Sequence, residues 1–170
     1  EREYLIYIPS IYDVSMEKVP VLFNFHGGSM TSYGQLQLSD MRSIADNANF
    51  ILIYPQGLVT DGSTIWNYGL PGGSNKSDTD DYGFIGSIIY DLLNHLRIDT
   101  ERLYACGYSN GAGFCYGLAS YPHLVGFSFA SIAPVSGLMS IEMSENASPI
   151  YPTNVIHFHG TSDFIRGYDG

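Results

Sequence analysis

A short run of small residues surrounds one serine near the middle of the chain. Gly107-Tyr108-Ser109-Asn110-Gly111 has the spacing G-x-S-x-G and follows the apolar run RLYACG, which is typical of a strand. In a sharp strand-to-helix turn the serine hydroxyl stands clear of the sheet, and glycines on both sides avoid collisions with strand and helix. The N-terminus of the next helix adds a positive dipole and free N–H groups. The pattern predicts that Ser109 is a catalytic nucleophile.

A second glycine-rich turn, FHGGSM (residues 25–30), closes an earlier apolar run. A turn of this kind brings backbone N–H groups towards the serine, where they stabilise the oxyanion of a tetrahedral intermediate. We expect Gly28, Ser29 and Asn110 to supply these groups. The alternative is a glycine turn without a ligand. His26 is expected to fix the shape of this loop and not to act as a base.

The acid of a catalytic triad is expected in HFHGTSD (residues 157–163). Asp163 follows a late strand, and the chain order serine, aspartate, histidine is that of α/β-hydrolase triads. An acid there orients the imidazole and stabilises its charged form. A solvated loop aspartate is the alternative reading of Asp163, and Asp169 is a weaker candidate for the acid.

The base of the triad has no obvious candidate in the chain. Each histidine is interpreted as a hydrogen-bonded structural residue, which applies to His26, His95, His123, His157 and His159. We therefore expect the triad histidine to lie beyond residue 170.

Strand-like and helical patterns alternate along the chain, and these elements must position the residues above. Strands are expected at 3–9, 19–28, 50–57, 102–109, 126–137 and 154–160, and helices at 36–48, 80–96 and 110–119. The alternation predicts an α/β fold: a mostly parallel sheet with helices on both faces and its chemistry at the carboxyl ends of the strands. Residues 1–170 are expected to form a single, partial α/β-hydrolase domain that lacks the last strand and helix. Absence of the first strand as well is left open.

Acidic residues dominate the charge of the protein. Asp and Glu number 17 against 7 Lys and Arg, which gives a formal net charge of −10. This balance argues against binding to nucleic acids or to anionic membranes. A hydrophobic content of 45% with only 14% charged residues argues against disorder.

Several motifs in order resemble one known family. REYLIYIP, VPVLFNFHGGS, YPQG, WNYG, DDYGFI, CGYSNGAG, APVSG and HFHGTSD are similar to the feruloyl esterase and polyhydroxybutyrate depolymerase group of α/β-hydrolases. The resemblance implies a serine esterase with Ser109 as nucleophile and Asp163 as acid, and with residues 26–29 in the oxyanion hole. It also implies feruloyl, acetyl or other short-chain esters as substrates, free or linked to polysaccharides. The stretch FIRGYDG departs from the family pattern after the acid, and the family histidine has no counterpart.

The resemblance favours a secreted or periplasmic location, and the sequence leaves the oligomeric state open. No metal or organic cofactor is expected, because acyl transfer through serine needs none. Trp66, together with Tyr68, is expected to form an apolar wall for the substrate, with simple loop packing as the alternative. Tyr108 is also assigned to substrate binding. The short segment between Gly137 and Asn154 predicts an open cleft without a large lid.

Two other functions remain open from the sequence. A peptidase or acyltransferase would use the same scaffold and nucleophile. A catalytically inactive, hydrolase-like binding module would explain the absent base.

Overall fold

A mostly parallel sheet forms the centre of the protein. The computed structural model describes residues 1–14, 16–70, 77–149 and 152–168. Within them the main sheet has six strands in the order β1-β3-β2-β6-β7-β8. The strands are β1 (Tyr4–Tyr7), β2 (Val19–Phe25), β3 (Ile51–Pro55), β6 (Ile98–Tyr108), β7 (Ser131–Val135) and β8 (Asn154–Val155). Among the described strands of this sheet only β1 pairs antiparallel, at the edge beside β3, so the expected mostly parallel sheet is confirmed.

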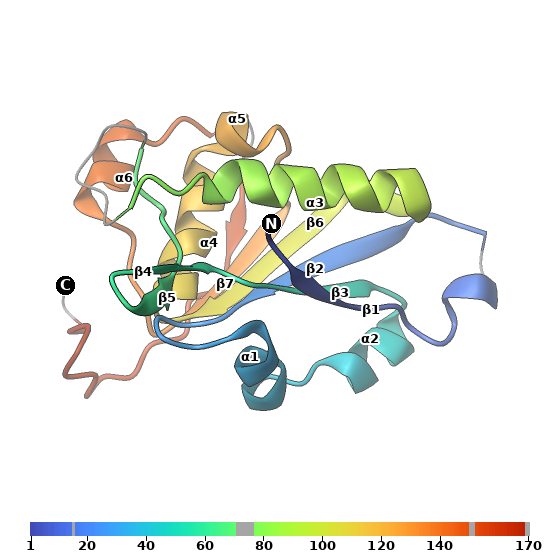
Figure 1. Cartoon of the computed structure of the whole chain (residues 1–170), viewed down its shortest axis with the longest axis horizontal. Coiled ribbons are helices and arrows are strands. Elements are labelled where there is room, and N and C mark those ends of the chain that lie inside the picture. Colours follow the sequence, from blue (N-terminus) through green and yellow to red (C-terminus); the bar gives the residue numbers. More distant parts are fainter. Residues whose placement is uncertain (15, 71–76, 150–151, 169–170) are drawn as a thin grey trace.

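Helices cover both faces of this sheet, with α3, α4 and α5 on one side and α1 and α2 on the other (Figure 1). The helices are α1 (Ser32–Leu38), α2 (Arg42–Ala48), α3 (Asp81–His95), α4 (Asn110–Ser120), α5 (Pro122–Val125) and α6 (Ile141–Asn146), and a short 3-10 helix, η1, spans Tyr12–Val14. The double cover explains why β3 is buried along its whole length. In the described parts of the chain, no helix has both the length and the apolar character needed to cross a bilayer.

The core lies between the sheet and the α3–α4 layer. The apolar stripe of α3 that the sequence predicts is buried at Ile85, Ile88, Ile89 and Leu92. It packs with aromatic residues from β2 and α4, including Phe25 and Phe114, in one continuous cluster. Burial of this stripe fixes α3, and with it the start of the helix near the site.

Several elements differ from the sequence-based expectation. The helix expected over 36–48 is divided into α1 and α2, and between them the carboxylate of Asp40 accepts the N–H of Arg42, the first residue of α2. Residues 58–79, where no strand or helix is expected, carry a hairpin of β4 (Leu58–Thr60) and β5 (Ser63–Ile65), and residues 71–76 lie outside the described residues. Helices α5 and α6 were not predicted.

The carboxyl ends of four strands meet at one edge of the sheet. Phe25 pairs with Gly107 and Tyr108 pairs with Val135. A single bridge then joins Val135 to Phe158, beyond the short β8. The segments that follow these ends therefore share this edge, where the sequence placed the chemistry.

Candidate active site

Ser109 occupies the sharp turn between β6 and α4. Its backbone has φ 53° and ψ −112°, outside the regions that non-glycine residues normally adopt. Its N–H donates to the carbonyl of Val135 at 2.9 Å, which ties the turn to β7. Helix α4 begins at the next residue, so the predicted strand–serine–helix turn is present.

Close backbone contacts explain the glycines around Ser109. A Cβ at Gly107 would lie 2.6 Å from the carbonyl oxygen of Gly111. One at Gly111 would lie 2.5 Å from the carbonyl oxygen of His26, and one at Gly137 would lie 2.3 Å from the Ser109 carbonyl oxygen. Real Cβ atoms are not found at such distances, so larger residues would force the turn apart.

Two amides at the turn are free to bind an oxyanion. No acceptor among the described residues takes the N–H of Gly28 or of Asn110. Asn110 is the first residue of α4, where helical N–H groups have no internal partner. Both residues line the same cleft as Ser109.

The expectation for Ser29 needs correction. Ser29 lines the cleft, but its N–H donates to the carbonyl of Thr64 at 2.8 Å and is not available to a substrate. Its backbone is left-handed, with φ 60°, as is that of Ser136 at the end of β7, with φ 50°. The hairpin makes a second bond to this loop, because the hydroxyl of Thr64 donates to the carbonyl of Met30. Strand β5 therefore holds the Gly28 loop in place.

His26 fixes this loop from inside the protein. Its side chain is fully buried, and its Nε2 accepts the N–H of Gly57 at 2.9 Å. Nδ1 then carries the proton and donates to the carbonyl of Gly27 at 2.7 Å. Burial lowers the pKa of His26, so the ring is neutral and both its nitrogens are used. The structural role expected for His26 agrees with these contacts.

A cleft of about 380 Å³ opens in front of Ser109. Besides Gly28, Ser29, Ser109 and Asn110, it is lined by residues 65–69 and by Ser140, Glu142 and Arg166. These side chains are largely polar or charged. Such a lining suits a substrate that carries hydroxyl groups more than a long hydrocarbon chain.

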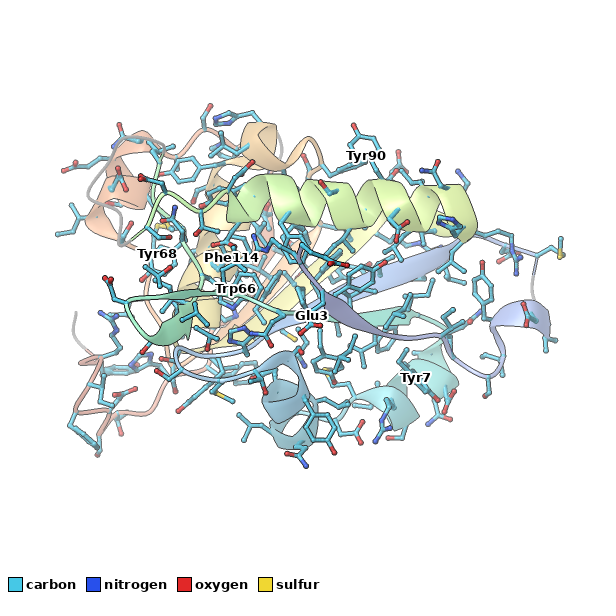
Figure 2. All side chains as sticks on the ribbon, in the orientation of Figure 1. Glu3, Tyr7, Trp66, Tyr68, Tyr90 and Phe114 are labelled. Carbon is cyan, nitrogen blue, oxygen red and sulfur yellow. The ribbon has the colours of Figure 1, made fainter. Side chains whose placement is uncertain are left out.

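Trp66 borders the cleft, but its ring belongs to the core. The residue is only 2% exposed, and its indole stacks on Phe114 and meets Phe25 edge to face. Figure 2 shows Trp66, Phe114 and Tyr68 close together in this part of the molecule. The apolar wall expected from the Trp66 ring is therefore not exposed, and the packing alternative describes it better. Tyr68, half-buried, lines the cleft itself.

Tyr108 faces a different groove. Its side chain lines a hollow of about 610 Å³ with Cys106, Val135 and Phe158, together with Leu38 and Met41 from the α1–α2 side. Successive residues of a strand point to opposite faces, and Leu103, Ala105 and Gly107 are buried on the other face of β6. The assignment of Tyr108 to the cleft at Ser109 is corrected for this reason.

Asp163 lies in the loop that follows the Val135–Phe158 bridge, at the same edge as Ser109. Its carboxylate accepts the N–H groups of Arg166 and Ile165, both at 2.9 Å, and these bonds lower its pKa. Asp163 is thus ionised at neutral pH, as an acid that orients an imidazole must be. The weaker candidate, Asp169, lies outside the described residues.

A chain of side-chain hydrogen bonds supports the Asp163 loop. His159 Nε2 lies 2.7 Å from the carbonyl of Arg166, which can only accept, so its Nδ1 is an acceptor when the ring is neutral. His157 then donates to it at 3.1 Å, and Tyr116 of α4 donates to His157 at 2.5 Å. The structural interpretation of His157 and His159 agrees with this arrangement.

No histidine is among the residues that line the cleft, and all five histidines are described. His95 bonds to the Asp91 carbonyl within α3, and His123 lies in α5. Across the described ranges, no group of three or more histidine, cysteine or acidic side chains is arranged to hold a metal ion.

Two residues that shape the cleft were missed or misread in the sequence. The side chain of Asn110 accepts the N–H of Trp66 at 2.6 Å and donates to its carbonyl at 3.2 Å, so it also clamps the cleft wall. Asp81 accepts the N–H of Asn67 at 2.7 Å, a contact that the sequence does not predict. The pair Asp80 and Asp81 at the start of α3 is visible in the sequence, but the partner of Asp81, Asn67 in a distant loop, is not.

The sequence of the chain is similar to those of known esterases. The sequence model described as Esterase PHB depolymerase matches residues 2–169. A bifunctional acetylxylan esterase/xylanase of Neocallimastix patriciarum is 27% identical over 98% of this chain, and feruloyl esterase B of Piromyces equi is 23% identical over 99%. The chain spans only 22% and 30% of the length of these two proteins.

Solved structures show the same fold. An acetyl xylan esterase from Aspergillus awamori superimposes with a TM-score of 0.75 at 16% identity, over 99% of this chain and 70% of that chain. A Bacillus cereus carboxylesterase superimposes with a TM-score of 0.70 at 17% identity, over 99% of this chain and 74% of that chain. The expected α/β-hydrolase fold is thus confirmed.

Proposed function

Because the chain belongs to the Esterase PHB depolymerase family, we propose that it is a serine carboxylic ester hydrolase acting through an acyl-enzyme. The observation that carries the proposal is the strained turn at Ser109, which opens into a cleft beside the free amides of Gly28 and Asn110. This arrangement supports a nucleophile with oxyanion donors beside it.

In the proposed reaction a base takes the hydroxyl proton of Ser109 while the Oγ of Ser109 forms a bond to the ester carbonyl carbon. The N–H groups of Gly28 and Asn110 stabilise the negative carbonyl oxygen; loss of one such donor typically raises the barrier by about 3 to 4 kcal/mol. The tetrahedral intermediate collapses, the C–O bond breaks, and the base returns the proton to the leaving alcohol. Water, deprotonated by the same base, then releases the acid and restores Ser109.

Asp163 is the proposed acid of the triad. Its ionised carboxylate at the Ser109 edge of the sheet supports this role. Since no described histidine lines the cleft, we propose that the base is a histidine carried by sequence after residue 170.

The proposed substrates are acetyl, feruloyl or other short-chain esters of plant polysaccharides. The polar lining from Ser140, Glu142 and Arg166 supports an alcohol rich in hydroxyl groups. The names of the fungal relatives, an acetylxylan esterase and a feruloyl esterase, support the same class.

Replacement of the nucleophile tests the proposal. We expect Ser109→Ala in the full-length protein to abolish labelling by a fluorophosphonate and to lower turnover of p-nitrophenyl acetate by at least about 10⁴-fold. Ser136→Ala is the matched control, because Ser136 shares the left-handed backbone and the sheet edge. Turnover by Ser109→Ala at the parent rate would refute the assignment. A parent protein that is neither labelled nor active would instead indicate an inactive binding module.

A further inference from the structure

The Trp66–Tyr68 wall of the cleft is held by a buried carboxylate, that of Asp81, at the start of α3. Asp81 is fully buried, and each of its oxygens has a different partner. Oδ1 lies 2.5 Å from Nη2 of Arg2, and Oδ2 accepts the N–H of Asn67 at 2.7 Å. Residue 2 and residue 67 are thus joined through one side chain at the helix N-terminus.

Arg2 is itself held in place from several directions. Its guanidinium lies 3.8 Å from the ring centre of Phe84 and donates to the carbonyl oxygens of Asp80 and Gln56. Gln56 continues the network, since its side-chain amide lies 3.3 Å from Nε2 of His26. The Arg2–Asp81 pair therefore contacts both the wall segment and the residues behind the Gly28 loop.

The bond to Asn67 fixes the middle of the wall segment. The neighbouring residues have their own clamps, since Asn110 bonds to the backbone of Trp66 and the Tyr82 hydroxyl bonds to the carbonyl of Tyr68. Among the described residues, only Asp81 accepts the N–H of Asn67. The position of the peptide between Trp66 and Asn67 in the cleft thus depends on Asp81.

Burial of a charge costs desolvation free energy, so a buried ion pair by itself adds little to the stability of the fold. Burial raises the pKa of Asp81, and the Asn67 N–H and Arg2 act against this shift. Apolar residues of similar size frequently replace buried ion pairs without loss of stability. What an apolar pair would lack is an acceptor for the backbone N–H in the cleft wall.

We propose that Arg2 and Asp81 are positioning residues that set the shape of the Trp66–Tyr68 wall, and through it the binding of the bulky alcohol part of the ester. This inference rests on the proposed function. In an acetyl ester the acyl part is small and lies next to Ser109 and the oxyanion amides, so the pair affects acetyl esters according to the size of their alcohol part.

The test compares Asp81→Asn with Asp80→Asn in the full-length protein. Both variants remove one negative charge at the start of α3, but Asn at residue 80 keeps the cap on the N–H of Gly83. We expect Asp81→Asn to speed amide hydrogen exchange in residues 65–69 by about tenfold, with the core peptides of β2 and β6 unchanged. Asp80→Asn should leave exchange in this segment as in the parent.

Kinetics then separate positioning from stability. Asp81→Asn should raise KM for an acetylated xylo-oligosaccharide by about fivefold, with kcat for that substrate and kcat/KM for ethyl acetate within about twofold of the parent. Arg2→Gln should shift both readouts in the same direction, and Arg2→Lys should restore them in part.

Unchanged exchange in residues 65–69 of Asp81→Asn would overturn the inference, whatever the activity. Faster exchange with equal effects on both esters would also overturn it, because the wall would then not discriminate by size. Failure of the proposed function has a separate signature, namely a parent protein that hydrolyses neither ester while the exchange result still stands.

Discussion

His26 shows how one side chain sets the shape of the site. Its neutral ring accepts from Gly57 and donates to the carbonyl of Gly27, next to the proposed oxyanion donor Gly28. A protonated ring would have to donate from both nitrogens, so the bond from Gly57 would be lost. Acid should therefore loosen the Gly28 loop from inside.

The pH dependence of stability follows from this. Burial lowers the folded-state pKa of His26 below the value of about 6.5 expected in the unfolded chain. The contribution of the neutral ring is full above that value and is lost as the pH falls below it. We expect His26→Gln to be less stable than the parent at pH 7 but to lose less stability between pH 7 and pH 5. Urea unfolding at the two pH values measures this, and equal losses in both proteins would contradict it.

At the scale of elements, the hairpin of β4 and β5 acts as a support for the oxyanion loop. Thr64 uses its carbonyl to accept from Ser29 and its hydroxyl to donate to the carbonyl of Met30. The Gly28 turn lies directly before these two bonds. The hairpin thus restrains the Gly28 loop.

Thr64→Val removes the hydroxyl and keeps the shape of the side chain. We expect kcat for p-nitrophenyl acetate to fall by about 3- to 10-fold with KM little changed, because a loosened Gly28 loop weakens transition-state stabilisation by about 1 kcal/mol. Thr60→Val, in the partner strand of the same hairpin, is the matched control. A fall of the same size in the control would show that the hairpin matters only for stability.

How far the sequence predicts the structure also depends on the element. The buried strands and α3 were predictable, because their apolar runs and stripes follow directly from burial on one or two faces. The hairpin was missed although its signal was present: Asp61-Gly62 between two short β-prone runs, with φ 50° and 81° in the structure. Such a pair is typical of a two-residue hairpin turn.

The site was predictable only in part, for a related reason. Ser109, Gly28 and Asn110 follow from a local turn pattern. The partner of the Ser29 N–H and the face of Tyr108 depend on the hairpin and on strand alternation, which the pattern does not contain. The clamp of Asp81 on Asn67 joins distant segments and has no local signal.

For the whole molecule, charge should influence the choice of polymer. The formal net charge is −10, so the protein repels polysaccharides that carry carboxylates. We expect kcat/KM for acetyl esters on an anionic xylan to rise severalfold between about 10 mM and about 200 mM NaCl, because salt screens this repulsion. Esters on a neutral xylo-oligosaccharide are the control and should change little. An equal response of both substrates would point to a general effect of salt on the enzyme.

The left-handed serines at the strand ends have a consequence for heat tolerance. Ser29, Ser109 and Ser136 all hold a positive φ that glycine adopts without strain. A search for heat-resistant variants should therefore recover glycine at 29 and 136, where the hydroxyl is dispensable for acyl transfer. At 109 the same exchange would also relieve strain, but it would remove the proposed nucleophile, so stability and activity place opposite demands on this position.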